Sequence, residues 1–210
     1  MEPAHLTDPT TPAPVLLRAE RPLLRHPGLE LFADLSFGIT PGLTLVRGGD
    51  GRGKTSLLRL MAGQLQPQSG RIERLAPQVF LADLREPQFD ATVLRTWLQA
   101  QHSLYPGWDA DLAADLVQAF GLAEHLDKTF HMVSTGTRRK TGLVAAFACG
   151  AGLTLLDTPF AALDAASREL LAELLKEASQ QRLRGFVLAD YALPPGVHEA
   201  DLAGLIELGD

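Results

Sequence analysis

Short β-prone runs alternate along this chain with longer stretches whose apolar residues follow helical spacing. Residues 43–46, 153–156 and 186–188 are short, mainly apolar runs of the kind that forms buried strands. Strands that alternate with helices predict an α/β core with a mostly parallel sheet. The helical spacing places two sets of residues on one face each: Leu57, Leu58, Met61 and Leu65, and then Leu170, Leu171, Leu174 and Leu175.

The N-terminal quarter carries further strand signals after an initial tail. Residues 1–14 are rich in Pro and Thr and poor in large apolar groups, which predicts a disordered tail before one domain over residues 15–210. Residues 15–17 predict a strand, and the alternation over residues 35–39 predicts a half-buried one. Residues 72–81 predict more strand, interrupted at Pro77.

The middle of the chain is predicted to be helical. Asp109 is a suitable N-cap for a helix that carries Leu112, Leu116, Val117 and Phe120 on one side. Because strand signals return only after this section, residues 92–140 are predicted to form a small helical insert.

Composition narrows the class of protein. The chain has 210 residues, 46% of them hydrophobic and 21% charged, which suits a globular domain with a real core. Its net charge of -6 argues against nucleic acid as a partner, since phosphate binding uses clustered Lys and Arg. The lone Cys149 lies in an apolar stretch and is predicted to be a buried packing residue of a cytoplasmic protein.

The sequence contains no recognisable membrane-spanning segment or signal peptide. Its longest uncharged stretch, residues 142–156, is too short to cross a bilayer and is interrupted by Gly150 and Gly152. A function at a membrane would therefore require a second, membrane-embedded chain.

Residues 48–55 satisfy the complete phosphate-loop pattern G-x-x-x-x-G-K-[ST] between a predicted strand and a predicted helix. Its glycines let successive backbone N–H groups point at phosphate oxygens, and the helix N-terminus adds further donors. Lys54 is expected to reach the β- and γ-phosphates, and the Thr55 hydroxyl to hold Mg²⁺. The predicted ATP-binding residues are Gly48, Gly49, Asp50, Gly51, Arg52, Gly53, Lys54, Thr55 and Ser56.

Asp157 closes the apolar run 153–156. A carboxylate at the end of a buried strand is often only a cap or a turn residue, but beside a phosphate loop it suits the second Mg²⁺ ligand. Thr55 and Asp157 are therefore the predicted metal-binding residues.

Two further segments resemble the ATP-binding-cassette (ABC) proteins. Residues 133–137, Val-Ser-Thr-Gly-Thr, are similar to the L-S-G-G-Q signature of that family and keep its Ser and second Gly. Residues 155–164 resemble the family's L-L-D-E-P-F-x-A-L-D. The resemblance covers about residues 15–208. In its compact size and in the amino-acid sequence of residues 56–63, the chain looks most like small cassettes such as the haem-exporter ATPase of cytochrome c maturation.

This resemblance implies a fold, partners and additional site residues. The fold would be an ABC-type phosphate-loop core with an N-terminal antiparallel β part and a small helical insert. Two cassettes would pair head to tail around ATP, so that Ser134 and Gly136 face the nucleotide of the partner cassette. The family places an aromatic against adenine at a position that falls on His26, although a surface-turn histidine is equally compatible with that site.

Three departures from the family pattern concern catalysis. The catalytic Glu after the Walker B Asp is replaced by Thr158, which cannot accept a proton near neutral pH. The switch His position falls on Asp190, and the Q-loop Gln position falls on Asp83. One interpretation is a degenerate cassette that binds ATP without turning it over. The other is that Asp83 or Asp190 supplies the carboxylate that Thr158 lacks.

The resemblance implies an ATP-binding subunit of an ABC-type transporter, with ATP and Mg²⁺ as cofactors and weak or absent hydrolysis. It would lie at the inner face of the cell membrane with a permease partner. The alternative is a soluble ATP-responsive regulatory protein with no transport role. A DNA-repair or translation cassette is disfavoured by the negative charge and the short length.

Three aromatic residues in the middle section admit two interpretations. Trp97, Tyr105 and Trp108 either pack the helical insert against the core or line a docking groove for a membrane partner.

Overall fold

The computed structural model describes residues 13–26, 29–32, 34–84 and 86–209, so nearly all of the predicted tail lies outside it. The strands are β1 (Leu17–His26), β2 (Leu29–Leu31), β3 (Ser36–Ile39), β4 (Gly42–Arg47), β5 (Ser69–Arg74), β6 (Val79–Leu81), β7 (Leu153–Asp157), β8 (Gly185–Asp190) and β9 (Gly204–Glu207). The helices are α1 (Lys54–Ala62), α2 (Leu94–Leu104), α3 (Ala110–Ala119), α4 (Thr135–Ala148) and α5 (Ala165–Ser179).

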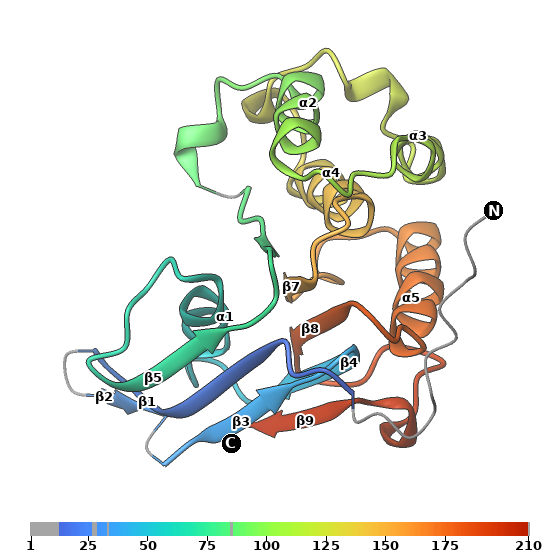
Figure 1. Cartoon of the computed structure of the whole chain (residues 1–210). Helices are drawn as coiled ribbons and strands as arrows, with labels where there is room; N and C mark the ends of the chain where they lie inside the picture. Colours follow the sequence, from blue (N-terminus) through green and yellow to red (C-terminus); the bar gives the residue numbers. More distant parts are fainter. Residues whose placement is uncertain (1–12, 27–28, 33, 85, 210) are drawn as a thin grey trace.

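The centre of the molecule is a five-stranded sheet in the order β6-β7-β8-β4-β9 (Figure 1). Every neighbouring pair in it is parallel. A parallel sheet needs a crossover between successive strands, and α1 and α5 supply two of these. The carboxyl ends of β4, β7 and β8 consequently lie at the same edge of the sheet.

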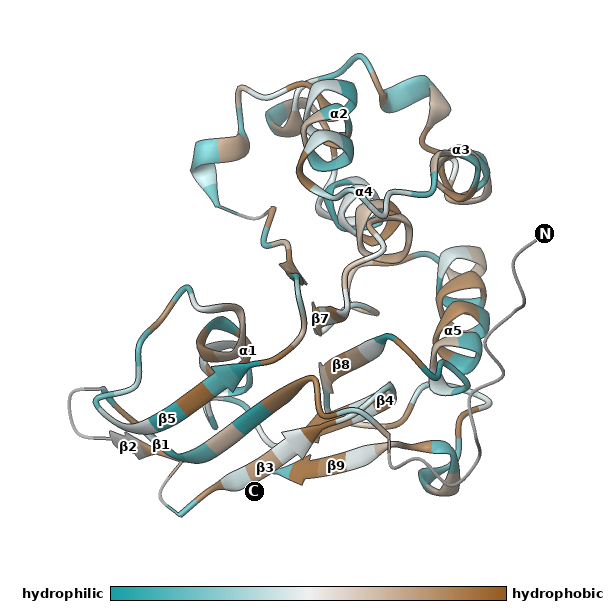
Figure 2. Ribbon diagram, in the orientation of Figure 1, coloured by the Kyte–Doolittle hydropathy of each residue, from teal (hydrophilic) through white to brown (hydrophobic). Residues whose placement is uncertain are grey.

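Two separate cores cover the two faces of this sheet. Leu43 and Leu45 of β4 belong to the core shared with α4, α5 and the helices of the middle section. Val46 belongs to the other core, which contains α1 and residues of β1. Because side chains alternate along a strand, a strand that is apolar on both faces can serve both cores. α5 carries apolar and polar residues together, as the mixed colours in Figure 2 show.

The N-terminal part forms the predicted antiparallel sheet. Its order is β2-β1-β3, and β5 also pairs with β1. α1 lies between this sheet and the parallel one, and its Leu57, Leu58 and Met61 are fully buried there.

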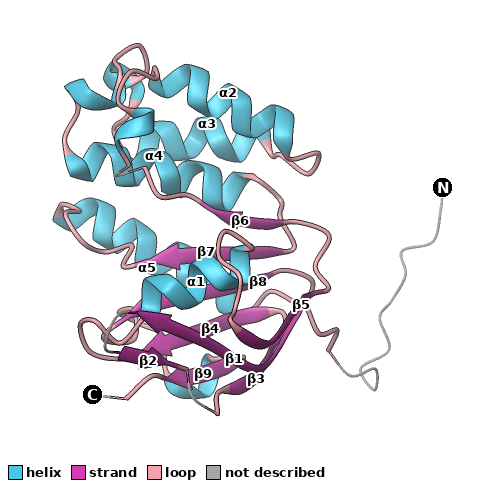
Figure 3. Ribbon diagram, turned by 90° about the vertical axis from the view of Figure 1, so that its left-hand side faces the viewer, coloured by secondary structure: helices cyan, strands magenta, loops and turns pink. Residues whose placement is uncertain are grey.

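The helices α2, α3 and α4 form a group at one end of the parallel sheet (Figure 3). Asp109 caps α3 as predicted, since its carboxylate accepts a hydrogen bond from the Leu112 N–H at 2.9 Å. Trp97 is only 7% exposed and meets the Phe130 ring edge-on at 6.1 Å. Tyr105 packs on Phe80 of β6. These two aromatic residues therefore hold the helices together and against the core.

Several element boundaries differ from the sequence predictions. β1 begins at Leu17 rather than at residue 15, and β5 begins at Ser69, three residues before the predicted start. α1 ends at Ala62, because Gly63 adopts the left-handed conformation (φ 78°), so Leu65 lies beyond the helix. The short strands β2 and β9 were not predicted, because each is stabilised mainly by pairing with another strand. β2 pairs with β1, and β9 pairs with β4.

Cys149 is fully buried, as predicted, and burial raises the pKa of its thiol. No helix in the described part of the chain has both the length and the apolar character required to cross a bilayer.

Candidate functional site

A cavity of about 750 Å³ lies at the carboxyl ends of β4, β7 and β8. Open parallel sheets generally bind ligands at this edge, and the volume falls in the usual range for small-molecule sites. The lining residues come from the phosphate loop, β2, the segment after β7, α5 and the end of β8: Leu31, Gly49, Asp50, Gly51, Gly53, Lys54, Thr55, Ser56, Asp157, Thr158, Phe160, Ala161, Arg168, Asp190 and Tyr191.

The phosphate loop connects β4 to α1, as predicted. Gly51 and Gly53 have φ angles of 75° and 91°, which strain residues with a Cβ. A Cβ on Gly53 would also lie 2.9 Å from the Phe32 ring. Glycine is required here because the loop curls tightly while packing against β2 and its following residue. The curl leaves the N-terminus of α1 facing the cavity, and orphan N–H groups at such a terminus favour anions.

Lys54 is held in place by the loop itself. Its side chain is buried, and its ammonium donates to the carbonyls of Gly48 at 2.6 Å and Gly49 at 2.8 Å. An ammonium that is fixed in this way beside a helix N-terminus forms a positively charged end to the cavity.

Thr55 and Asp157 are brought together from positions 102 residues apart. The Thr55 hydroxyl donates to Asp157 Oδ2 at 2.9 Å. Hydroxyl and carboxylate oxygens are the donors that Mg²⁺ prefers, and Mg²⁺ commonly takes one or two protein ligands and completes its shell with water and phosphate oxygens. The pair therefore fits the predicted magnesium site.

Thr158 follows Asp157 and lines the same cavity. Its φ of 43° is left-handed, which is unusual for a β-branched residue. Its N–H donates to the Ala189 carbonyl at 2.8 Å, and its own carbonyl accepts a hydrogen bond from Arg139. The neighbouring strand and α4 thus hold a neutral hydroxyl at the position next to the metal pair.

Asp190 lies at the end of β8 and also lines the cavity. Its carboxylate accepts a hydrogen bond from the Tyr191 N–H at 2.8 Å. Burial raises the pKa of Asp190, while this hydrogen bond and the charges of Lys54, Arg168 and Arg139 act in the opposite direction.

Tyr191 and Arg168 line the cavity but were not among the predicted site residues. The Tyr191 ring lies 4.2 Å from Lys54 Nζ, and its hydroxyl bonds to Asp50. Arg168 lies on α5 and donates to the Phe160 carbonyl at 3.0 Å. The family motif marks the end of β8, but its spacing does not show whether Asp190 or the adjacent Tyr191 faces the phosphate loop.

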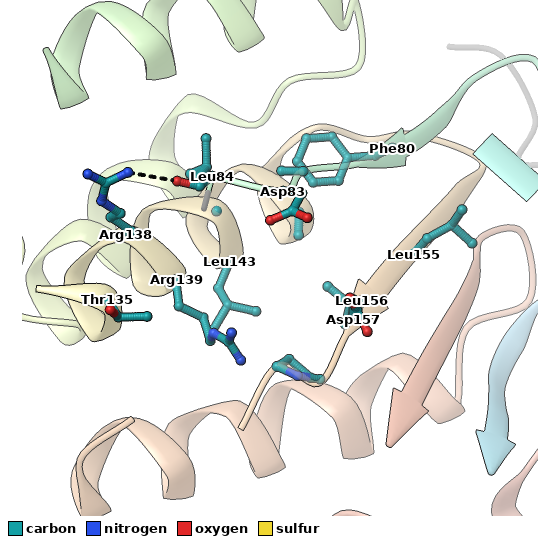
Figure 4. Close-up of a pocket in the computed structure, with 14 residues that line it drawn as sticks. Phe80, Asp83, Leu84, Thr135, Arg138, Arg139, Leu143, Leu155, Leu156 and Asp157 are labelled. Atoms are coloured by element: carbon teal, nitrogen blue, oxygen red, sulfur yellow. Dashed lines mark hydrogen bonds between the residues drawn. The ribbon is translucent and has the colours of Figure 1, made fainter. Parts of the chain in front are cut away.

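Asp83 lies outside the lining of this cavity. It faces a smaller cavity of about 60 Å³ between β7, α4 and the segment after β6, together with Asp157, Arg138 and Arg139 (Figure 4). Asp83 also forms an ion pair with Arg59 of α1 at 3.3 Å. Asp157 borders both cavities, so Asp83 shares a cavity with one member of the metal pair but not with the phosphate loop.

Two signature residues lie at the start of α4. Ser134 caps this helix by accepting from the Thr137 N–H at 3.1 Å, and its side chain is exposed. A Cβ on Gly136 would lie only 2.5 Å from the Ala162 carbonyl oxygen. Within the described residues, neither residue lines the cavity above the phosphate loop of its own chain.

The segment after Asp157 is tied to the same helix. Asp164 caps α5 and accepts from Lys140 of α4 at 2.5 Å. The Lys140 ammonium, together with the Ser167 N–H, holds the pKa of Asp164 well below its usual range.

Of the remaining predicted residues, Ser56 lines the cavity, while Gly48 contributes its carbonyl to Lys54. Arg52 is exposed and is not among the lining residues of the described chain. His26 pairs with Leu29 at the end of β1, but its side chain lies outside the described part of the structure.

The family model for ABC transporters matches residues 32–161. Among curated relatives, the chain is 33% identical to the cytochrome c biogenesis ATP-binding export protein CcmA of Pseudomonas syringae pv. syringae, over 91% of this chain and 97% of the relative. It is 31% identical to the taurine import ATP-binding protein TauB of Pseudomonas aeruginosa, over 78% of this chain and 66% of that protein.

Solved structures show the same fold at lower identity. An ABC transporter ATP-binding protein from Pyrococcus furiosus superposes with a TM-score of 0.69 at 20% identity, over 91% of this chain and 96% of that chain.

Proposed function

The chain belongs to the ABC transporter family, as an ATP-binding domain, and from that premise we propose that it binds Mg-ATP at its phosphate loop with weak or absent hydrolysis. The triphosphate would lie on the loop N–H groups, with Lys54 at the β- and γ-phosphates. Thr55 and Asp157 would hold Mg²⁺, which neutralises phosphate charge when bound.

The Thr55–Asp157 contact is the observation that carries this proposal. A glycine-rich turn alone has many uses, but here a buried lysine and a hydroxyl–carboxylate pair meet at one end of a single cavity. This combination of an anion cradle with two hard oxygen donors suits a metal-bound polyphosphate better than any other common ligand.

Thr158 is the basis for expecting slow hydrolysis. The attacking water needs a group that orients it and draws its proton away, and a threonine hydroxyl does not accept a proton near pH 7. Losing such a group typically reduces a rate by ~10²–10⁴. The site would therefore retain nucleotide affinity while the chemical step is slowed.

Asp190 is the better placed of the two replacement carboxylates. It shares the cavity with Lys54 and Asp157, whereas Asp83 faces the smaller cavity and is paired with Arg59. If the chain does turn over ATP, Asp190 is the first residue to substitute.

A second cassette and a membrane-embedded permease complete the proposed assembly, at the inner face of a membrane. The exposed Ser134 at the N-terminus of α4 supports an action of the signature in another chain's site. Similarity over 97% of an export protein of cytochrome c biogenesis, against 66% of a taurine importer, favours a compact exporter.

The direct test is steady-state Mg-ATP hydrolysis by the purified chain, with nucleotide affinity measured in parallel. The wild type is compared with Thr158→Glu, which supplies the missing carboxylate, and with Lys54→Ala, which removes the ammonium. We expect the wild type to bind ATP and hydrolyse at background, Thr158→Glu to gain activity, and Lys54→Ala to lose binding.

If the wild type turns over ATP at an ordinary rate and Lys54→Ala abolishes that activity, the proposed loss of hydrolysis is contradicted. The proposed ATP binding at the phosphate loop would still stand. In that case Asp190→Asn and Asp83→Asn are compared. The variant that loses activity without losing affinity identifies the replacement carboxylate.

A further inference from the structure

The end of β8 contacts the phosphate loop through one side chain. Tyr191 is 51% exposed at the mouth of the larger cavity, and its hydroxyl bonds to Asp50. The two residues are 141 positions apart, so this contact closes a link between the loop after β8 and the loop after β4.

The same tyrosine ring covers the lysine that should meet the phosphates. Its centroid lies 4.2 Å from Lys54 Nζ, well within the distance of an attractive cation–π contact. The ammonium also donates to the carbonyls of Gly48 and Gly49. Two carbonyls and one ring therefore satisfy the three N–H groups of Lys54 from within the protein itself.

A phosphate that binds to Lys54 must displace part of this arrangement. The ring and an incoming phosphate oxygen both require close approach to the ammonium. The Asp50 carboxylate adds to the cost, because it holds the ring in place and because an unmasked carboxylate repels phosphate. The hydroxyl keeps its proton in this contact, since the hydrogen bond to Asp50 raises the pKa of Tyr191.

We propose that Tyr191, anchored by Asp50, is a latch that covers Lys54 and competes with the phosphates of the nucleotide. This inference rests on the proposed Mg-ATP site. The Tyr191–Asp50 latch lowers the apparent affinity in proportion to the fraction of molecules in which it is closed. Tyr191 and Asp50 would then set the nucleotide concentration at which the cassette becomes loaded.

The test is calorimetric measurement of Mg-ATP and Mg-ADP affinity for the wild type, Tyr191→Ala and Tyr191→Phe. Tyr191→Ala removes the ring and the hydroxyl, and should bind both nucleotides about tenfold more tightly. Tyr191→Phe keeps the ring over Lys54 but cannot bond to Asp50, and should show a smaller gain of roughly two- to threefold. Because the side chain is half exposed, neither variant should unfold, and circular dichroism checks this.

A double-mutant cycle separates anchoring from simple charge repulsion. Asp50→Asn should increase affinity in the wild-type background and should do so less in the Tyr191→Ala background, because the latch is already absent there. Repulsion of phosphate by Asp50 alone would give equal gains in both backgrounds. Asp115→Asn, on the exposed side of α3, is the matched control for the change in net charge.

The possible results have distinct meanings. Unchanged or weaker binding by Tyr191→Ala would overturn the latch while leaving the nucleotide site in place. Equal gains from Asp50→Asn in both backgrounds would overturn the role of Asp50 as its anchor. Absence of binding by both the wild type and Tyr191→Ala at millimolar nucleotide would instead overturn the proposed function, and the latch with it.

Discussion

At the scale of single residues, Thr158 is the most unusual position in the candidate site. It combines a left-handed backbone with a β-branched side chain, and it stands where the family resemblance places a catalytic glutamate. Its backbone groups are fixed by Ala189 and Arg139, so the surrounding structure imposes this conformation rather than the residue itself.

Replacing Thr158 by glycine should therefore stabilise the protein. A left-handed backbone costs an L-residue about 1–2 kcal/mol, of which the greater freedom of unfolded glycine cancels about 0.5–1 kcal/mol. We expect Thr158→Gly to raise the free energy of unfolding by about 0.5–1 kcal/mol in urea titrations. Thr129→Gly is the matched control at an extended position (φ −81°) and should be destabilising. Loss of stability in both variants would show that the Thr158 backbone is not strained.

At the scale of elements, α4 joins the signature to the rest of the molecule. Arg138 donates to the Leu84 carbonyl in the segment after β6 (Figure 4). Arg139 donates to the Thr158 carbonyl after β7. Lys140 pairs with Asp164. Three consecutive basic residues of one helix thus hold two segments, the one after β6 and the one between β7 and α5.

Two glycines of α4 should respond in opposite ways to alanine. A Cβ on Gly136 meets the Ala162 carbonyl at 2.5 Å, whereas one on Gly142 meets only side chains at 3.6 Å or more. Gly142→Ala should raise the free energy of unfolding by about 0.5–1 kcal/mol, the ordinary gain within a helix. Gly136→Ala should lower it by about 1–2 kcal/mol, because overpacking against backbone outweighs that gain. Equal effects of the two substitutions in chemical denaturation would contradict the close contact between α4 and the segment after β7.

At the scale of the whole molecule, the position of the signature bears on assembly. Ser134, at the N-terminus of α4, is exposed and is not among the described residues that line the larger cavity. A helix N-terminus attracts anions, so the signature of one chain could cover the phosphates bound to another. Nucleotide would then act as the bridge between two chains.

We therefore expect Mg-ATP to convert the chain from monomer to dimer in sedimentation velocity, and Mg-ADP to leave it monomeric. Ser134→Asp preserves the helix cap but places a negative charge against the partner's phosphates, so it should bind ATP without dimerising. Ser134→Asn keeps both the cap and neutrality and is the matched control. A wild-type chain that remains monomeric when saturated with Mg-ATP would contradict this assembly.

Much of this architecture was predictable because its signals are local. The phosphate loop, the apolar strand that ends at Asp157 and the Asp109 cap each depend on residues within a few positions of one another, and all were found where expected. Fold class followed, since alternating strands and helices leave few ways to build a sheet. The strands β2 and β9 escaped prediction because each is stabilised by pairing more than by its own sequence.

The amino-acid sequence alone thus determined the fold class, the phosphate loop and the family resemblance, because each depends on residues that are close together along the chain. Only the tertiary structure decided which side chains share a cavity. It placed Asp190 in the same cavity as Lys54, and Asp83 in a separate cavity that Asp157 also borders. It also brought Tyr191 over Lys54. The physical reason is that these neighbours come from different strands, and a displacement of one residue along a strand sends a side chain to the opposite face.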